Sequence, residues 1–209
     1  MARVNGQIKR DQPFGELIYE YSRNTNIKNI VEIGTWKGMG STKCIIDGLV
    51  ERNDDYSFIS VELFPEMHQK ALENLKSLIY GNDKINLLNG SIIDYEESFW
   101  FNHWFDKEVM IMPEPHRTWY MADMHHLKSQ KNVLDQIPES IDFLVLDGGE
   151  FTTYLEYKKL KSRTKIIALD DTNILKCHKI REELMAEKCE VIYDSDSERY
   201  GVSIFKIND

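Results

Sequence analysis

The stretch that most constrains this fold is residues 30–42, which read Ile-Val-Glu-Ile-Gly-Thr-Trp-Lys-Gly-Met-Gly-Ser-Thr. A short apolar strand is expected here, followed by a glycine-containing turn and a helix that begins at Ser41 or Thr42. Glycine permits positive φ angles and close approach of the backbone to a ligand, and the first turn of a helix presents unpaired N–H groups. The stretch therefore predicts a strand–turn–helix unit that binds a nucleoside-bearing ligand.

The spacing of the glycines separates this loop from two common nucleotide-binding loops. Gly34, Gly38 and Gly40 follow a G-x-x-x-G-x-G order, whereas a dinucleotide-binding loop needs G-x-G-x-x-G and a P-loop ends in Gly-Lys-Ser/Thr. Glu32 would repel a pyrophosphate, so a cationic or zwitterionic ligand is favoured. The alternative is an ordinary turn between strand and helix whose glycines have no binding role.

Strands and helices alternate along most of the chain. Strands are expected at 29–33, 57–62, 85–88, 141–147, 165–169, 190–193 and 200–206, and helices at 11–22, 41–51, 65–79, 153–162 and 174–188. This alternation is typical of a doubly wound, mostly parallel sheet, and the last two strands follow one another directly. We therefore expect an α/β, Rossmann-like fold with a seven-stranded sheet and an antiparallel terminal hairpin, in a single domain over residues 1–209.

The segment 95–138 is longer than a plain crossover between two strands requires. Aromatic and histidine side chains gather in it: Phe99, Trp100, Phe101, His103, Trp104, Phe105, His116, Trp119, Tyr120, His125 and His126. Long insertions in compact domains usually form lids or binding loops, so we interpret this segment as an inserted lid over a substrate. A dimerisation element or an additional packing layer would also explain it, and these interpretations are compatible.

Two expected strands end next to residues able to hold a nucleoside, because ligands of open α/β sheets lie beyond the carboxyl ends of the strands. Glu62 ends the second strand and could accept hydrogen bonds from both hydroxyls of a ribose, with Leu63 packing on the adenine. Ser91 follows the third strand and is placed to contact the adenine ring. Glu62 could instead serve only as an acid that stabilises a helix N-terminus.

Acidic residues also follow the fourth and fifth strands. Asp147 and Glu150 come after the fourth strand, and Asp170 and Asp171 come after the fifth. Three aspartates at adjacent strand ends would repel one another and raise each other's pKa. A divalent cation would remove that conflict, and carboxylates suit Mg²⁺, Mn²⁺ or Ca²⁺ better than zinc. The alternative is that Asp170 and Asp171 only cap the following helix.

Glu32, Gly34 and Gly38 match an E/D-x-G-x-x-x-G motif, so the chain resembles class I S-adenosylmethionine-dependent methyltransferases. Within that class the acids after strands four and five make it most similar to metal-dependent sugar and macrolide O-methyltransferases and to cephalosporin-hydroxylase-like proteins. That resemblance covers most of the chain, because the class also ends in an antiparallel hairpin. It implies S-adenosylmethionine and Mg²⁺ (or Mn²⁺) as cofactors.

The resemblance also assigns roles to single residues. Asp147, Asp170 and Asp171 are the implied metal ligands, and Asp147 and Glu150 are the implied catalytic residues. The implied cofactor contacts surround the strand ends: Glu32, Gly34, Thr35, Trp36, Gly38, Gly40, Ser41, Glu62, Leu63, Ser91 and Asp147. Glu150 stands where many relatives have the histidine of D-G-x-H, so the general base is left open between Glu150 and a histidine of segment 95–138.

The implied activity is divalent-metal-assisted O-methylation of a small hydroxylated molecule, such as a sugar, a phenol or a natural product. Three alternatives compete with it. The first is a hydroxylase-like or other enzyme on the same scaffold, and the second is a nicotinamide-dependent oxidoreductase, which the missing G-x-G-x-x-G disfavours. The third is a binding module without catalytic activity.

Charge and composition limit the expected partners. The net charge of -9 disfavours a nucleic-acid partner, and the lack of a run of ~18 apolar residues disfavours a membrane span. Cys44, Cys177 and Cys189 lie far apart, so neither a disulfide framework nor a zinc site is expected. We expect a cytoplasmic protein that takes a small-molecule acceptor, and self-association into a homo-oligomer is left open.

Overall fold

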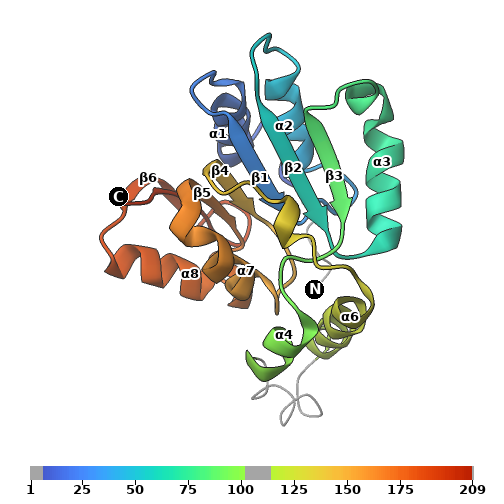
Figure 1. The fold of residues 1–209 in the computed structure, drawn as a ribbon. Helices are drawn as coiled ribbons and strands as arrows, with labels where there is room; N and C mark the ends of the chain where they lie inside the picture. The colour runs from blue at the N-terminus through green and yellow to red at the C-terminus, as the bar shows by residue number, and fades with distance from the viewer. Residues whose placement is uncertain (1–6, 102–113, 209) are drawn as a thin grey trace.

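The computed structural model describes residues 7–101 and 114–208, and its centre is a seven-stranded sheet (Figure 1). The strands are β1 (Asn29–Ile33), β2 (Ser57–Glu62), β3 (Ile85–Asn89), β4 (Ile141–Leu146), β5 (Thr164–Asp170), β6 (Glu190–Ser195) and β7 (Val202–Lys206). Their order across the sheet is β3-β2-β1-β4-β5-β7-β6. β7 is antiparallel to β5 and β6, and the remaining pairs are parallel. The predicted fold class is confirmed.

The sheet has two apolar faces because successive side chains of a strand point to opposite sides. Ile30 and Phe143 enter one core cluster, whereas their chain neighbours Val31 and Leu144 enter the other. All six residues of β4 are buried, as expected for a central parallel strand covered on both faces. The centre of the molecule is therefore a sheet between two hydrophobic layers.

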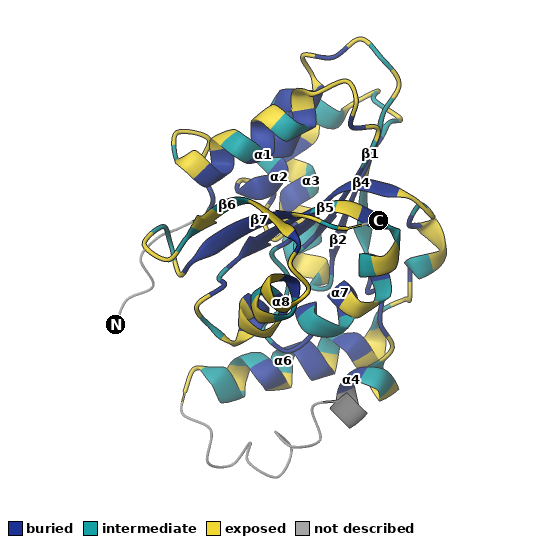
Figure 2. Cartoon of the chain, turned by 90° about the vertical axis from the view of Figure 1, so that its left-hand side faces the viewer, coloured by how far each residue is buried: buried dark blue, intermediate teal, exposed yellow. Residues whose placement is uncertain are grey.

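Helices cover the two faces as two groups, above and below the sheet in Figure 2. One group is α1 (Pro13–Arg23), α2 (Ser41–Leu49) and α3 (Pro65–Ile79), and the other is α6 (His116–Ser129), α7 (Thr153–Leu160) and α8 (Leu175–Ala186). The described residues also form three short elements: α4 (Tyr95–Phe101), η1 (Leu134–Gln136) and η2 (Lys161–Arg163). β1, β2 and α3 begin and end where the sequence predicts.

The terminal hairpin differs from its predicted bounds at the turn. β6 continues to Ser195, and β7 begins at Val202 rather than at residue 200. Gly201 has a φ of +84° and its N–H donates to the Glu198 carbonyl, so the residues before β7 form the turn. β7 lies between β5 and β6, which leaves β6 at the edge of the sheet.

The inserted segment 95–138 contributes α4, α6 and η1, and its residues 102–113 lie outside the described part of the chain. His103, Trp104 and Phe105 therefore lie outside it as well. On α6, Tyr120 and Met124 are buried in the same core cluster as α7 and α8. Helix α6 is thus a packing layer, as one interpretation of the segment holds, and its role as a lid stays a prediction.

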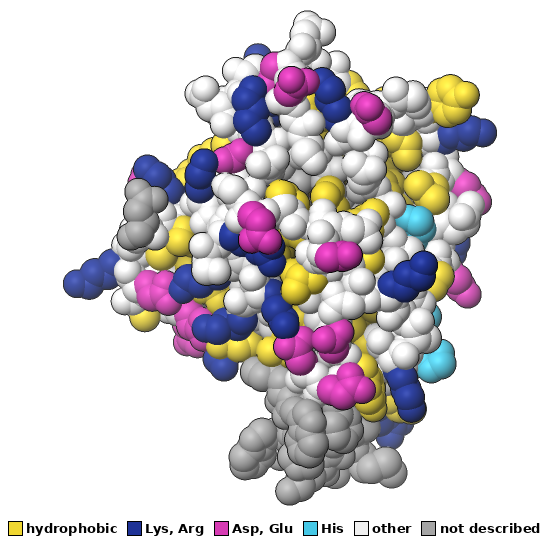
Figure 3. Space-filling view, in the orientation of Figure 1, with side chains coloured by type: hydrophobic (Ala, Val, Ile, Leu, Met, Phe, Trp, Pro, Cys, Tyr) yellow, Lys and Arg dark blue, Asp and Glu magenta, His cyan; other side chains and the backbone are white. Residues whose placement is uncertain are grey.

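The surface mixes charges of both signs. On the face shown in Figure 3, basic and acidic side chains are intermingled rather than gathered in separate regions. The lysine-rich end of α7 follows this pattern, because Lys158 pairs with Glu183 and Lys159 with Glu97. None of the helices within residues 7–101 and 114–208 has the length and apolar character to span a bilayer.

Candidate functional site

The loop between β1 and α2 requires glycine at two of its three glycine positions. Gly34 has a φ of +102°, and a Cβ added there would lie 2.2 Å from the Asp147 carbonyl oxygen. Gly38 has a φ of +74°, and its Cβ would lie 2.6 Å from Leu75 Cδ1. Gly40 has a negative φ of −106°, and a Cβ added there would lie no closer than 3.4 Å to a neighbouring atom. The geometry therefore requires the two glycines of the E-x-G-x-x-x-G motif.

Glu32 lies beneath this loop and is fully buried. Its Oε2 accepts hydrogen bonds from Thr42 Oγ1 at 2.7 Å and from Ser60 Oγ at 2.5 Å, and Ser60 Oγ also contacts Thr35 Oγ1 at 2.5 Å. Burial raises the pKa of Glu32, while the hydroxyls of Ser41, Ser60 and Thr42 oppose that rise. In this structure Glu32 fastens the loop and the start of α2 to the sheet.

Glu62, at the end of β2, holds the next part of the site together. Its Oε2 accepts the Trp36 N–H at 2.5 Å, and its Oε1 accepts the Phe64 N–H at 2.8 Å. The side chain is almost completely buried, and burial raises its pKa to about 7 despite these two hydrogen bonds. Each carboxylate oxygen has a second lone pair, so Glu62 can still accept two hydroxyl groups of a ligand.

Aromatic rings stand beside Glu62. Trp36 is 42% exposed and held at a φ of 50°, and its ring meets Phe64 edge-on at 6.3 Å. The Phe64 ring lies 4.4 Å from that of His126 on α6, and Leu63 packs against the core. Such surfaces can stack on a flat heterocycle.

Ser91, which the sequence predicts to contact an adenine, makes hydrogen bonds to the backbone around the turn after β3. Its Oγ accepts the Ile93 N–H at 3.1 Å, and its own N–H donates to the Lys131 carbonyl at 2.9 Å. Ser91 is buried: its hydroxyl shapes the turn after β3, and its backbone N–H fastens this turn to the segment that precedes η1. A contact between Ser91 and a ligand stays a prediction.

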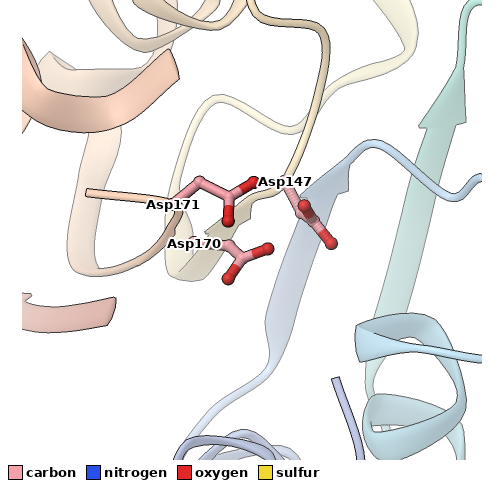
Figure 4. A group of neighbouring side chains, drawn as sticks. All are labelled: Asp147, Asp170 and Asp171. Carbon is pink, nitrogen blue, oxygen red and sulfur yellow. The ribbon is translucent and has the colours of Figure 1, made fainter. Parts of the chain in front are cut away.

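The three predicted aspartates do lie together. Asp147 follows β4, Asp170 is the last residue of β5, and Asp171 comes directly after it. The carboxyl groups of the three residues lie close together (Figure 4). One oxygen from each carboxylate lies within 4.8 Å of the others. We call these residues the aspartate triad.

A lysine and an arginine form ion pairs with the aspartate triad. Lys176 Nζ lies 2.7 Å from Asp147 Oδ1, 2.8 Å from Asp171 Oδ2 and 3.6 Å from Asp170 Oδ2. Arg199 approaches Asp170 with two nitrogens, Nε at 2.7 Å from Oδ1 and Nη2 at 2.8 Å from Oδ2. The repulsion that led us to expect a metal is thus relieved by side chains of the chain itself.

The ionisation of these groups follows from the pairing. Burial opposes a charge on Asp170, yet Lys176 and Arg199 hold its pKa below the usual range. Burial alone would lower the pKa of Lys176, but the three carboxylates raise it well above the usual range. The donor set suits a hard cation, but an ammonium already lies among the oxygens that would bind one. The triad as it stands therefore does not fit a divalent metal.

A second group of carboxylates lies next to the triad, and we call Asp123 and Glu156 the acidic pair. Both are about 95% buried, on α6 and α7, and they lie against the Gly148–Gly149 backbone. Burial raises the pKa of Asp123 to about 7 and that of Glu156 to about 8, and Glu62 adds to both shifts. Within the described residues, no ion pair joins either carboxylate to a lysine or arginine.

Glu150, the predicted catalytic residue, lies in the loop after β4. Its side chain is 8% exposed, and its Oε1 lies 3.5 Å from Nδ1 of His116 at the start of α6. The sequence left the general base open between Glu150 and a histidine of segment 95–138. The structure places Glu150 close to one of these histidines, His116. The His116 ring is half exposed to solvent.

Sequence reasoning missed several residues of this site. Ser60 had a signal, because it is a polar residue within an otherwise apolar strand. Lys176 had a weaker one, because a lysine in the first turn of a helix opposes the helix dipole. Asp123, Glu156 and Arg199 gave none, because they are brought to the site by packing between elements.

No family model matches the chain, and no curated protein matches it. The solved structures similar to it include the SAH-bound methyltransferase PaMTH1 of Podospora anserina, at a TM-score of 0.58 and 15% identity over 93% of this chain and 78% of that chain.

Two O-methyltransferases are also similar. One is from Bacillus cereus, in complex with SAH, at a TM-score of 0.57 and 16% identity over 94% of this chain and 82% of that chain. The other is TomG from Streptomyces achromogenes, involved in tomaymycin synthesis and in complex with SAM, at a TM-score of 0.56 and 11% identity over 94% and 80%. At these identities the likeness shows the fold, which is that of class I methyltransferases.

Proposed function

We propose that this chain is an S-adenosylmethionine-dependent methyltransferase that methylates a hydroxyl of a small molecule. The observation that carries the proposal is Glu62, a buried carboxylate at the end of β2 that joins the glycine loop to the loop after β2. The fold supports it, since solved structures similar to this chain are SAM- or SAH-bound methyltransferases. Their O-methyltransferase names support a hydroxyl as the acceptor.

The cofactor would lie across the carboxyl ends of β1, β2 and β4. Glu62 would accept the two ribose hydroxyls, and Trp36 and Leu63 would contact the adenine. The backbone of the turn that contains Gly34 and Gly38 would approach the methionine portion of the cofactor. Glycine permits this close approach because it has no Cβ. Thr35, Gly40, Ser41 and Ser91 complete the proposed contacts. When bound, S-adenosylmethionine supplies a methyl group on a positively charged sulfur.

The protein's part in methyl transfer is alignment and proton removal. Alignment of donor and acceptor removes much of the barrier to an in-line displacement. Glu150 and His116 form the pair that would take the acceptor proton and pass it to water, because the two groups lie within reach of one another and the histidine is half exposed. Asp147, three residues earlier in the loop, would orient the acceptor. A divalent metal on the aspartate triad, which the resemblance implies, would require Lys176 to leave.

Calorimetric titration tests the cofactor. We expect S-adenosylhomocysteine to bind the full chain and NAD⁺ to give no heat. Glu62→Gln should weaken binding of S-adenosylhomocysteine by about 10- to 100-fold, the scale of charge-assisted hydrogen bonds. Glu73→Gln is the matched control, because Glu73 lies exposed on α3 and contacts Gln69 instead of the site. Heat with NAD⁺ alone, or equal affinities in the two variants, would contradict the proposal.

Transfer of a labelled methyl group tests the chemistry. The chain is incubated with labelled S-adenosylmethionine and with sugars, phenols and larger hydroxylated natural products. For any acceptor found, Glu150→Gln should lower kcat while leaving the affinity for S-adenosylhomocysteine near that of the unmodified chain. Products methylated only on nitrogen or carbon would reject the hydroxyl acceptor.

A further inference from the structure

We propose that Lys176 is a built-in cation that takes the place of a divalent metal in the aspartate triad, so that this chain does not bind such a metal there. The inference rests on the arrangement of Lys176, Arg199 and the triad. Its consequence for catalysis, that methyl transfer needs no divalent ion, rests in addition on the proposed function.

The position of Lys176 indicates that it is held by the triad rather than by its helix. It is the second residue of α8, where the positive end of the helix dipole disfavours a cation. It is nevertheless only 6% exposed, and a lysine is rarely buried unless it is paired. The contacts at 2.7 Å and 2.8 Å to Asp147 and Asp171 supply that pairing. The ammonium thus bridges the ends of β4 and β5, as a metal ion would.

Steric and electrostatic arguments exclude a divalent ion while Lys176 is present. Mg²⁺ binds carboxylate oxygens at about 2.0–2.1 Å, so an ion on the same oxygens of Asp147 and Asp171 would overlap the ammonium. A divalent charge beside Lys176 would also be repelled at short range in a poorly solvated environment.

Arg199 removes the third potential ligand. Both oxygens of Asp170 already accept hydrogen bonds from its guanidinium, and Asp170 is completely buried. Asp171 keeps one buried oxygen, Oδ1, without a hydrogen-bond partner in the described part of the chain. Without Lys176, Asp147 and Asp171 would be left as a pair of carboxylates, which together with water is a sufficient ligand set for Mg²⁺ or Mn²⁺.

Direct titration with Mn²⁺, followed by the paramagnetic resonance of the free ion, tests the proposal. The unmodified chain should show no binding that depends on the triad, whereas Lys176→Ala should bind Mn²⁺ at least about tenfold more tightly. Lys176→Ala combined with Asp171→Asn should lose this gain. Lys70→Ala, which removes an exposed lysine from α3, is the matched control and should behave as the unmodified chain.

Three results would overturn the proposal. The first is Mn²⁺ binding by the unmodified chain that Asp171→Asn abolishes, and this result does not depend on whether a Lys176 variant folds. The second is a folded Lys176→Ala, checked by circular dichroism, that gains no affinity. The third is methyl transfer by the unmodified chain that a chelator abolishes and Mg²⁺ restores. Failure to bind S-adenosylhomocysteine would instead contradict the proposed function and leave the Mn²⁺ results interpretable.

Discussion

Two groups of buried carboxylates lie side by side at the carboxyl edge of the sheet, and they differ in what neutralises them. The aspartate triad has Lys176 and Arg199 within hydrogen-bonding distance. The acidic pair, Asp123 and Glu156, has a glycine backbone and Thr152 beside it instead. The pKa of Asp170 is consequently lowered, whereas those of Asp123 and Glu156 rise to about 7 and about 8.

The difference shows that burial alone does not determine the charge of a carboxylate. Asp170 is more deeply buried than Asp123, yet it stays ionised because cations face it. The acidic pair has no such partner among the described residues and instead holds protons near neutral pH. Asp170 should therefore stay ionised, whereas burial raises the pKa of its neighbour Asp147 well above the usual range, as it raises those of the acidic pair.

The largest expected effect is the loss of Lys176. Lys176→Met removes one partner from a buried ionic cluster, which should lower the free energy of unfolding by about 3–5 kcal/mol. Urea unfolding at neutral pH measures this change, with Lys70→Met on the exposed face of α3 as the control. Equal stability of the two variants would mean that the triad does not depend on its lysine.

An intermediate effect is expected from the acidic pair. Acids whose pKa is raised by folding bind more protons in the native than in the unfolded state, so the stability of the unmodified chain should fall as the pH rises from about 4.5 to about 8. Glu156→Gln removes one such group and should make the chain more stable at about pH 8.5 by on the order of 1–3 kcal/mol, with little change at about pH 4.5.

The control for this prediction is Glu182→Gln, because the Glu182 side chain is 67% exposed on α8. Urea unfolding at both pH values should give this variant the same pH dependence as the unmodified chain. A pH dependence unchanged in Glu156→Gln would show that Glu156 stays ionised in the folded protein, and the contrast with the triad would disappear.

The smallest expected effect links Glu62 to cofactor binding. Glu62 has a pKa of about 7 and must be ionised to accept two hydroxyls with both of its oxygens. Affinity for S-adenosylhomocysteine should therefore fall by up to about tenfold per pH unit below about pH 7. Calorimetry across this range should give a flat profile for Glu62→Gln and an unchanged slope for Glu73→Gln. A flat profile for the unmodified chain would contradict the role of Glu62.

The sequence was sufficient to predict those features of the fold and the site that depend on a local pattern. Alternating apolar strands and helices predicted the sheet, and the glycine spacing marked two positions in the loop after β1 where a Cβ would collide. The clustering of Asp147, Asp170 and Asp171 was also predictable, because parallel strands end at one edge of a sheet. Each of these inferences needs only neighbours along the chain or a general rule of topology.

The sequence was insufficient where a distant element supplies the partner. That Lys176 rather than a metal would face the triad depends on how α8 packs after β5, and Arg199 comes from the turn before β7. The burial of Asp123 likewise depends on the packing of α6 against the loop after β4. A local pattern shows which charges are present, but their compensation is decided by tertiary structure.

The place of Arg199 in the chain has a consequence for biosynthesis. Residues 147–176, which include the three aspartates and Lys176, are synthesised before Arg199. In the same way β5 is synthesised before β7, the antiparallel strand with which β5 pairs. In a nascent chain arrested before residue 199, Asp170 would lack the guanidinium of Arg199, and β5 would lack its neighbour β7. The aspartate triad can therefore be completed only after residue 199 has been synthesised, and removal of the residues from 199 onward would leave a polypeptide that cannot complete it.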